Sequence, residues 1–137
     1  ELILVDGNQI EFQEYNQISI IKGDAKSFHI ASASIIAKVN RDKIMENYSK
    51  ILPKYGFENH KGYGTKQHFQ AIKNYKSSII HRKSFNPINK HLAPLDYYIK
   101  NNITDSLLIQ IAGDHLIRNN HQIIKVQGLY IYSENHR

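Results

Sequence analysis

The first part of the chain contains two short apolar runs that precede a long stretch with helical spacing. Residues 2–5 and 18–21 are rich in β-branched side chains, which predicts two strands. The residues between them contain turn formers, so we expect a loop or a third, weaker strand there. Each run is followed by an acid, Asp6 after the first and Asp24 after the second. Carboxylates at the ends of neighbouring strands can converge on one spot.

From Ser27 to Ile51 apolar residues recur every three or four positions, which predicts one long helix or two consecutive helices packed through one face. Pro53 and Gly56 are expected to end this region, and residues 54–64 are expected to form a loop. Thr65 is then expected to cap a short helix over residues 65–75. The residues expected to face inward are Phe28, Ala31, Ile35, Val39, Ile44, Met45 and Tyr48 in the long helix and Phe69 and Ile72 in the short one.

The last third of the chain has a different character. Residues 92–99 and 106–117 have helical periodicity, with Thr104 as the expected N-cap of the second helix. Residues 123–132 predict a hairpin that turns at Gln127 and Gly128. A chain of 137 residues with 41% hydrophobic content can build one modest core. We therefore expect an α/β protein with one domain, or one domain with an appendage.

The net charge of +6 is concentrated in the middle of the chain. Residues 22–83 carry thirteen Lys or Arg against four acids, whereas residues 1–21 carry four acids and no Lys or Arg. Such a concentration suits a polyanion, since each Lys or Arg placed on a phosphate releases condensed counterions. On charge alone, a solvated lysine-rich surface is an equally good interpretation.

Composition excludes several kinds of site. The chain has no cysteine, so it has neither a disulfide framework nor a thiolate metal site. None of the eight histidines forms an H-x₃-H or H-E-x-x-H pattern with a partner acid, and a histidine metal site is not expected. No apolar stretch approaches the roughly 20 residues that span a bilayer, and no leader peptide is visible. We expect a soluble, cytoplasmic protein.

Asp6 and Asp24 each permit two interpretations. An Asp before Gly at a strand end is usually a turn former, and an Asp at a helix start can be an N-cap that stabilises the free N–H groups. Hard carboxylate oxygens are also the ligands that Mg²⁺ or Mn²⁺ takes, together with water and substrate phosphate. Taken one at a time, each acid favours the turn or cap interpretation over the metal-ligand one.

Three segments, in this order, resemble ribonuclease HII, the family that cuts RNA joined to DNA. They are D-G-N beginning at Asp6, K-G-D-A-K-S-F-H-I-A-S-A-S-I-I-A-K-V-N-R-D over residues 22–42, and H-K-G-Y-G-T over residues 60–65. The resemblance covers residues 1–87 and implies a ribonuclease H-like mixed sheet with helices, while residues 88–137 form an unassigned α+β tail. The family opens with an Asp-Glu pair that this sequence lacks, so we expect the sheet to be incomplete at its N-terminus.

The resemblance implies that Asp6 and Asp24 are catalytic metal ligands. It implies a two-metal hydrolysis with Mg²⁺ or Mn²⁺ ions about 4 Å apart, one aiming a water and the other steadying the leaving oxygen. Four carboxylates form this site in the family, and two of them belong to the Asp-Glu segment. Glu11, Glu14 and Asp42 are expected to be solvated surface acids instead. We therefore expect the chain to be inactive by itself.

The resemblance also implies a set of substrate contacts. Tyr63 resembles the tyrosine that stacks on the sugar at an RNA–DNA junction, although such a ring could also serve only packing. Lys38 and Arg41 are candidates for phosphate contacts, although either could pair with Glu46 or with an acid of the missing segment. His60 and His81 lie in two motifs that the family also shows, H-K-G-Y-G-T and H-R-x-S-F. The implied substrate-binding residues are Lys26, Ser34, Lys38, Arg41, Lys61, Tyr63 and Arg82.

These expectations define one leading function and two alternatives. The leading function is metal-dependent endonucleolytic cleavage of the RNA strand in RNA–DNA hybrids and of ribonucleotides embedded in DNA. Its partner would be an RNA–DNA hybrid or a DNA duplex that contains ribonucleotides, with no membrane involved. The first alternative is a non-catalytic, basic nucleic-acid-binding module. The second is a degraded gene remnant whose tail was never selected for folding.

Overall fold

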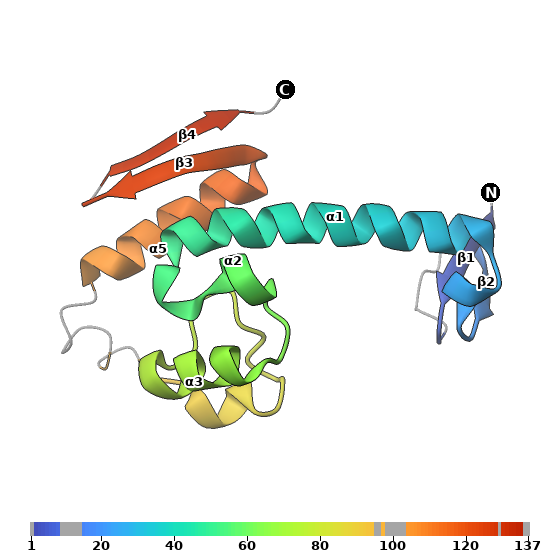
Figure 1. Cartoon of the computed structure of the whole chain (residues 1–137), viewed down its shortest axis with the longest axis horizontal. Helices are drawn as coiled ribbons and strands as arrows, with labels where there is room; N and C mark the ends of the chain where they lie inside the picture. Colours follow the sequence, from blue (N-terminus) through green and yellow to red (C-terminus); the bar gives the residue numbers. More distant parts are fainter. Residues whose placement is uncertain (1, 9–14, 95–96, 98–103, 129, 136–137) are drawn as a thin grey trace. The chain divides into compact units, whose positions relative to one another are not determined.

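A computed structural model of the chain describes residues 2–8, 15–94, 97, 104–128 and 130–135 (Figure 1). The described residues combine helices with two small sheets, which confirms the expected mixed α/β class. The chain divides into two compact units, residues 1–42 and residues 43–137. Within the described ranges, no helix is long and apolar enough to span a lipid bilayer.

The first unit is built on two parallel strands, β1 (Leu2–Asp6) and β2 (Asn16–Ile20). Their register runs from Leu2 opposite Asn16 to Asp6 opposite Ile20. Both predicted strands are therefore present, although β2 begins and ends earlier than the apolar run suggests. It ends before Lys22 because that residue adopts a left-handed conformation, with φ of 56°, and turns the chain. The third strand considered between them falls on residues 9–14, outside the described residues.

The long helix is continuous, and α1 spans Phe28–Ile51. The expectation that one apolar face of it would be packed is wrong over residues 28–44. Phe28 is 82% exposed and Ile35 is 64% exposed, and Val39 and Ile44 are also exposed. Only Ile30 is buried in this part of the helix, because the two short strands and the turn that follows them supply few apolar contacts.

The second unit continues from the end of α1 through several short helices. The segment expected to be a loop, residues 54–64, instead contains most of η2 (Pro53–Tyr55) and all of α2 (Phe57–His60). They are followed by α3 (Lys66–Tyr75) and η3 (Ile88–His91). Thr65 caps α3 as predicted, since its hydroxyl accepts a hydrogen bond from the backbone N–H of His68. Ile72 faces inward as expected, whereas Phe69 is 39% exposed, so its predicted burial is wrong.

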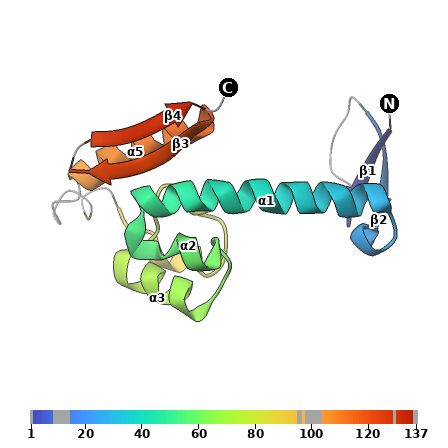
Figure 2. The same cartoon turned by 45° about the horizontal axis from the view of Figure 1, so that its top comes forward.

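The end of the chain forms a helix and a hairpin. Helix α5 spans Thr104–Arg118 and includes Thr104, which had been expected as its cap. Strands β3 (His121–Gln127) and β4 (Tyr130–Asn135) pair antiparallel, which confirms the predicted hairpin. The hairpin lies along α5 in the views of Figures 1 and 2. The helix predicted over residues 92–99 is wrong for residues 92–94, which are not helical, while residues 95, 96, 98 and 99 lie outside the described residues.

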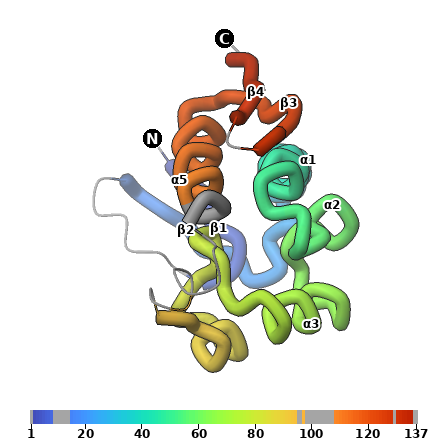
Figure 3. Tube along the Cα trace, turned by 90° about the vertical axis from the view of Figure 1, so that its left-hand side faces the viewer, coloured from blue at the N-terminus to red at the C-terminus, as the bar shows by residue number. Residues whose placement is uncertain are grey.

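The core of the second unit joins residues from both ends of that unit. Phe57 and Ile72 are each 1% exposed and Ile123 is fully buried. Helix α5 lies beside the end of α1 (Figure 3), where the Tyr48 hydroxyl donates a 2.5 Å hydrogen bond to Asp114. The division of the chain at residues 87 and 88 stays a prediction. The buried core residues are Tyr48, Ile51, Leu52, Tyr55, Phe57, Ala71, Ile72, Ile88, Ile109, Ile117 and Ile123.

Candidate metal and nucleic-acid site

Asp6 is fixed by a hydrogen bond to the turn that follows β2. Its Oδ1 atom accepts a 2.7 Å hydrogen bond from the backbone N–H of Gly23, seventeen residues further along the chain. A Cβ atom on Gly23 would lie 3.2 Å from that same oxygen and 2.6 Å from Cδ1 of Ile30. Glycine at this position therefore lets the turn approach the carboxylate closely. The strand end and the turn are held together by this contact.

Asp24 follows Gly23 directly and lies in η1 (Gly23–Ala25). Its Oδ1 atom accepts a 2.9 Å hydrogen bond from the backbone N–H of Ala25. The interpretation of Asp24 as the cap of the long helix is wrong, because α1 begins only at Phe28. Since Gly23 binds Asp6 and neighbouring Cα atoms are about 3.8 Å apart, one short turn brings both acids to the same region of the first unit. Both side chains belong to exposed residues.

The donor set of this region suits a hard divalent cation in part. Among the described residues, each of the two carboxylates accepts one hydrogen bond through Oδ1, enters no ion pair and keeps Oδ2 unpaired. One or two carboxylates are the usual protein share of a Mg²⁺ site, with water and substrate phosphate completing it. The described ranges contain no group of three or more His, Cys, Asp or Glu side chains that could enclose a metal ion. Asp6 and Asp24 therefore fit an open, partial site.

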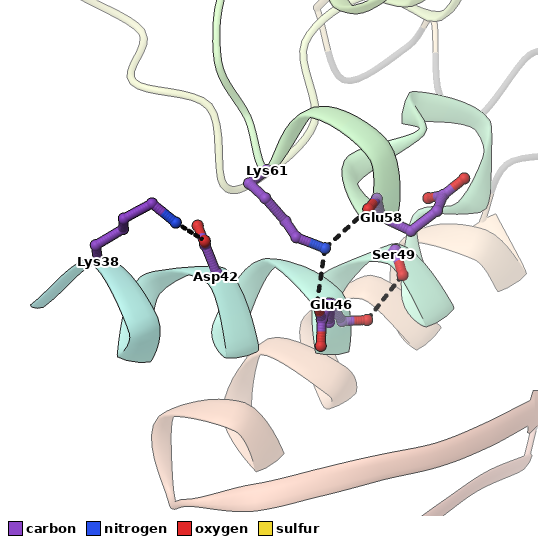
Figure 4. Close-up of polar contacts among 6 residues, drawn as sticks. All are labelled: Lys38, Asp42, Glu46, Ser49, Glu58 and Lys61. Carbon is purple, nitrogen blue, oxygen red and sulfur yellow. Dashed lines mark hydrogen bonds and ion pairs between the residues drawn. The ribbon is translucent and has the colours of Figure 1, made fainter. Parts of the chain in front are cut away.

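Polar residues of the first unit continue from η1 along α1. Lys26 lies between η1 and α1 and is exposed, as are Ser34 and Lys38. Ser34, Lys38 and Arg41 follow one another at steps of four and three, so they share one side of the helix. Lys38 Nζ lies 2.7 Å from a carboxylate oxygen of Asp42 (Figure 4). Asp42 therefore pairs with Lys38 and does not join Asp6. Arg41 is half-buried.

Lys61 has a contact that sequence reasoning did not anticipate. Its Nζ atom lies 2.7 Å from Oε1 of Glu46 and 2.8 Å from the backbone oxygen of Glu58 (Figure 4). The ammonium group thereby ties the end of α2 to α1. Glu46, which had been considered a partner of Lys38 or Arg41, pairs with Lys61 instead. Arg82 is exposed and places its guanidinium 5.1 Å from the ring centre of Phe85.

Tyr63 lies in a tight turn between α2 and α3, and its side chain is half exposed. The turn is closed by backbone hydrogen bonds from Tyr63 N–H to His60 and from Thr65 N–H to Tyr63, both 2.8 Å long. Gly62 has φ of 80°, a region that favours glycine, and a Cβ atom on Gly64 would lie 3.2 Å from the Phe69 ring. The two glycines are therefore explained by backbone conformation and by packing.

Three histidine rings underlie this turn, and sequence reasoning missed them as a group. His60 and His68 stack with ring centres 4.5 Å apart, and His68 Nε2 lies 3.1 Å from His81 Nε2. Burial lowers the pKa of His68, and burial together with the neighbouring His68 lowers the pKa of His81 to about 4. The only signal in the sequence is that two of these histidines flank the G-Y-G segment. His81 lies in a separate loop, after α3.

The site residues predicted from the sequence fall into two sets. Asp6, Asp24, Lys26, Ser34, Lys38 and Arg41 belong to the first unit, whereas Lys61, Tyr63 and Arg82 belong to the second. Within the first set, the structure holds the turn that carries Asp24 against the Asp6 carboxylate through the Gly23 N–H. Within the second, it places Lys61 and Tyr63 in and beside one turn.

Comparison with known proteins matches the region that carries both sets. The chain is 55% identical over 91 residues to the ribonuclease HII of Mycoplasma capricolum, a match that covers 66% of this chain and 44% of that protein. It is 53% identical over 85 residues to the ribonuclease HII of Clostridioides difficile, covering 62% and 33%, respectively. The chain thus spans less than half of the length of these relatives. A sequence model of ribonuclease HII matches residues 1–88, most of the chain, and the chain therefore belongs to the ribonuclease HII family.

Proposed function

We propose that this chain contributes part of the active site of a metal-dependent endonuclease. Its substrates would be the RNA strand of RNA–DNA hybrids and ribonucleotides embedded in DNA. The observation that carries the proposal is the hydrogen bond from Gly23 to Asp6, which places one carboxylate beside the turn that bears the other, Asp24. Family membership over residues 1–88 and the mixed α/β structure support it.

Asp6 and Asp24 would hold Mg²⁺ or Mn²⁺, in line with the general dependence of the family on divalent metal ions. The bound metal supplies an activated water and charge stabilisation for the departing oxygen. Asp6 is well suited to this role, because its Oδ1 atom is fixed by the Gly23 N–H while Oδ2 is unpaired among the described residues. Two carboxylates fall short of the four that the resemblance implies, so we propose that cleavage requires the family's Asp-Glu segment as well.

The basic residues would contact the phosphates of the substrate. Lys26, Lys38, Arg41 and Arg82 are the candidates, with Ser34 as a hydroxyl donor. The ion pair between Lys38 and Asp42 does not oppose this role, because exposed pairs of this kind contribute only about 0.2–1 kcal/mol. Lys61 would combine two tasks, since it also ties α2 to α1 through Glu46. Tyr63 would stack on the sugar at the junction, where its turn presents a half-exposed ring.

The alternative function is a basic nucleic-acid-binding module without catalysis. It is favoured by the thirteen Lys or Arg against four acids in residues 22–83, together with a site that has two carboxylates. The two functions make different demands on Asp6 and Asp24. A binding module tolerates their neutralisation, whereas a metal-dependent nuclease does not.

The test uses a chimera in which this chain's residues replace the matched 91-residue segment of the Mycoplasma capricolum ribonuclease HII. The substrate is a labelled DNA duplex with one ribonucleotide, assayed with Mg²⁺, with Mn²⁺ and with a chelator. Asp6→Asn and Asp24→Asn keep the side-chain oxygen that accepts each backbone hydrogen bond but remove the charge. We expect each to lower the cleavage rate at least about 100-fold.

Glu58→Gln is the matched control, because Glu58 is an exposed acid of α2 outside the proposed metal site. It should retain the rate of the unsubstituted chimera. Full cleavage by the Asp24→Asn chimera would refute the ligand assignment. A chimera that binds the duplex but cleaves it with neither metal would favour the non-catalytic module.

A further inference from the structure

We propose that His60, His68 and His81 are positioning residues that hold the Tyr63 turn through a network of neutral imidazoles. The role assigned to Tyr63 rests on the proposed function. The network itself rests on geometry alone. Nothing in the sequence resemblance assigns a task to these three rings.

Every nitrogen of the three rings has a partner. His60 Nε2 lies 2.8 Å from the backbone oxygen of Tyr55, and His60 Nδ1 accepts a hydrogen bond of 3.2 Å from the Gly62 N–H. His68 Nδ1 lies 3.0 Å from the backbone oxygen of Tyr63, and His68 Nε2 lies 3.1 Å from His81 Nε2. His81 Nδ1 is approached by the Ser78 N–H at 3.0 Å and by the Ser78 hydroxyl at 2.7 Å.

These partners leave one consistent assignment of protons. A carbonyl oxygen accepts only, so His60 must carry its proton on Nε2 and His68 must carry its proton on Nδ1. The unprotonated Nε2 of His68 is then an acceptor, and His81 must donate to it from Nε2. This leaves His81 Nδ1 as the acceptor for the Ser78 N–H. The three rings thus carry three protons in total, and all are neutral.

A fourth proton would break a contact wherever it bound. On His60 Nδ1 it would face the Gly62 N–H, and on His81 Nδ1 it would face the Ser78 N–H, leaving the Ser78 hydroxyl as its only acceptor there. On His68 Nε2 it would place two N–H groups against each other. The lowered pKa values of His68 and His81 agree with this account, since burial disfavours the charged ring in both.

Among the described residues, no negative charge pairs with these rings to compensate for such a proton. The Phe57 ring packs against all three imidazoles, with ring centres 5.4–5.9 Å away. Other adjoining groups include the Tyr55 phenol, which donates to the Lys76 carbonyl, and Lys61, which follows His60 in the chain and whose ammonium pairs with Glu46. In the part of the chain that the structure describes, no carboxylate forms an ion pair with any of the three rings.

The network reaches the turn at two points, the Gly62 N–H and the Tyr63 carbonyl. The Gly62 N–H precedes Tyr63 in the chain and the Tyr63 carbonyl follows its Cα atom, so the two hydrogen bonds restrict the backbone of Gly62 and Tyr63. A network of neutral rings would keep this backbone fixed at neutral pH and release it in acid. His60, His68 and His81 would then determine where the Tyr63 ring is presented without touching a substrate.

The first experiment records the ring nitrogens of the full chain by ¹H–¹⁵N NMR from pH 8 to pH 4. At pH 7 we expect neutral rings with protons on His60 Nε2, His68 Nδ1 and His81 Nε2. The amide signals of Gly62 and Tyr63 should shift with the same midpoint as His68 and His81, while that of Val126 in β3 should not. A protonated ring at pH 7, or His81 with its proton on Nδ1, would overturn the proposal.

The second experiment compares amide hydrogen exchange in two variants of one residue. His68→Phe keeps an aromatic ring against Phe57 but removes the donor to Tyr63, and it should speed exchange at Tyr63 and Thr65 about tenfold. His68→Asn restores an N–H near the Nδ1 position and should recover most of the protection. His29→Phe, at an exposed histidine of α1, is the matched control and should change neither amide. Equal exchange in His68→Phe and His68→Asn would overturn the proposal.

Cleavage by the chimera separates this inference from the function on which it rests. If His68→Phe loosens the turn and also slows cleavage at the ribonucleotide, both stand. If the NMR results are as expected but Tyr63→Ala cleaves at the unsubstituted rate, the positioning network stands and the proposed role of Tyr63 fails.

Discussion

Replacing Gly23 with alanine is expected to displace Asp6 through lack of space rather than through backbone strain. Gly23 is not among the glycines with positive φ, so its backbone is open to other residues. The added Cβ atom would lie 2.6 Å from Ile30 Cδ1, closer than real Cβ contacts come, and 3.2 Å from Asp6 Oδ1. Ile30 is 5% exposed and has little room to turn away, whereas Asp6 is exposed. Asp6 is therefore the group expected to move.

The change in stability is the sum of one stabilising and two destabilising contributions. Alanine restricts the unfolded chain and by itself would stabilise the fold by about 0.4–1 kcal/mol. Overpacking against a buried side chain costs about 1–3 kcal/mol. Losing the hydrogen bond to the Asp6 carboxylate costs up to about 1.5–3 kcal/mol, and less here because the group is exposed. We expect a net local destabilisation of about 1–3 kcal/mol.

The assay is native-state hydrogen exchange at the Gly7 amide, which donates to the Ile20 carbonyl at the end of the β1–β2 pair. Ile30→Val removes the Cδ1 atom that the new Cβ atom would strike and alone should cost about 0.5–1.5 kcal/mol. In the double variant, part of the Gly23→Ala cost should disappear, giving a coupling of about 1 kcal/mol.

Gly7→Ala is the contrasting control, since a Cβ atom there meets no atom within 4 Å. Its φ of +85° makes alanine cost about 1–2 kcal/mol through the backbone alone, and Ile30→Val should not relieve that cost. Strict additivity of Gly23→Ala and Ile30→Val would refute the steric argument.

Three further predictions concern the second unit and the basic segment. Phe57→Ala should lower the free energy of unfolding by about 3–5 kcal/mol in urea denaturation, because Phe57 is 1% exposed. An unchanged urea midpoint would contradict the place of Phe57 in the core. Because the pKa of His81 is lowered to about 4, the unfolded chain binds more protons than the folded chain between pH 6.5 and 4. The contribution of His81 to stability should therefore be fully present above pH 6.5 and fall across this window. A thermal unfolding midpoint that rises on acidification would contradict this direction. For binding of duplex DNA by residues 22–83 within the chain, the logarithm of the association constant should fall by about 0.9 for each tenfold increase in salt concentration and each phosphate contacted. An affinity that does not depend on salt would exclude phosphate contacts.

Features encoded by a few neighbouring residues could be read from the sequence. The Thr65 cap and the hairpin around Gly128 depend on side chains within one turn, and both were predicted correctly. The start of α1 was predicted to within one residue, but the role of Asp24 was not, because its position depends on the contact between Gly23 and Asp6, which local spacing does not reveal. Periodicity likewise indicated that Phe28 lies on an apolar face but not that this face is exposed.

The candidate site shows the same limit. The acids and basic residues were identified as types, yet the pairing of Lys61 with Glu46 depends on how α2 returns to α1. The histidine network joins rings from α2, from α3 and from the loop after α3, so no fixed spacing marks it. Sequence patterns therefore identified most of the helices and strands, but they did not identify the contacts between them.

The hydrogen bonds between the end of α1 and β3 set an order for events during biosynthesis. Asn47 accepts a 3.1 Å hydrogen bond from the Ile123 N–H, 76 residues further along the chain. At synthesis rates of about 5–20 residues per second, Asn47 leaves the ribosome roughly 4–15 s before its partner. During that interval Tyr48 and Ile51 have no α5 or β3 against which to pack. The nascent chain therefore carries an uncovered apolar surface for seconds, which is long enough for a chaperone to engage it.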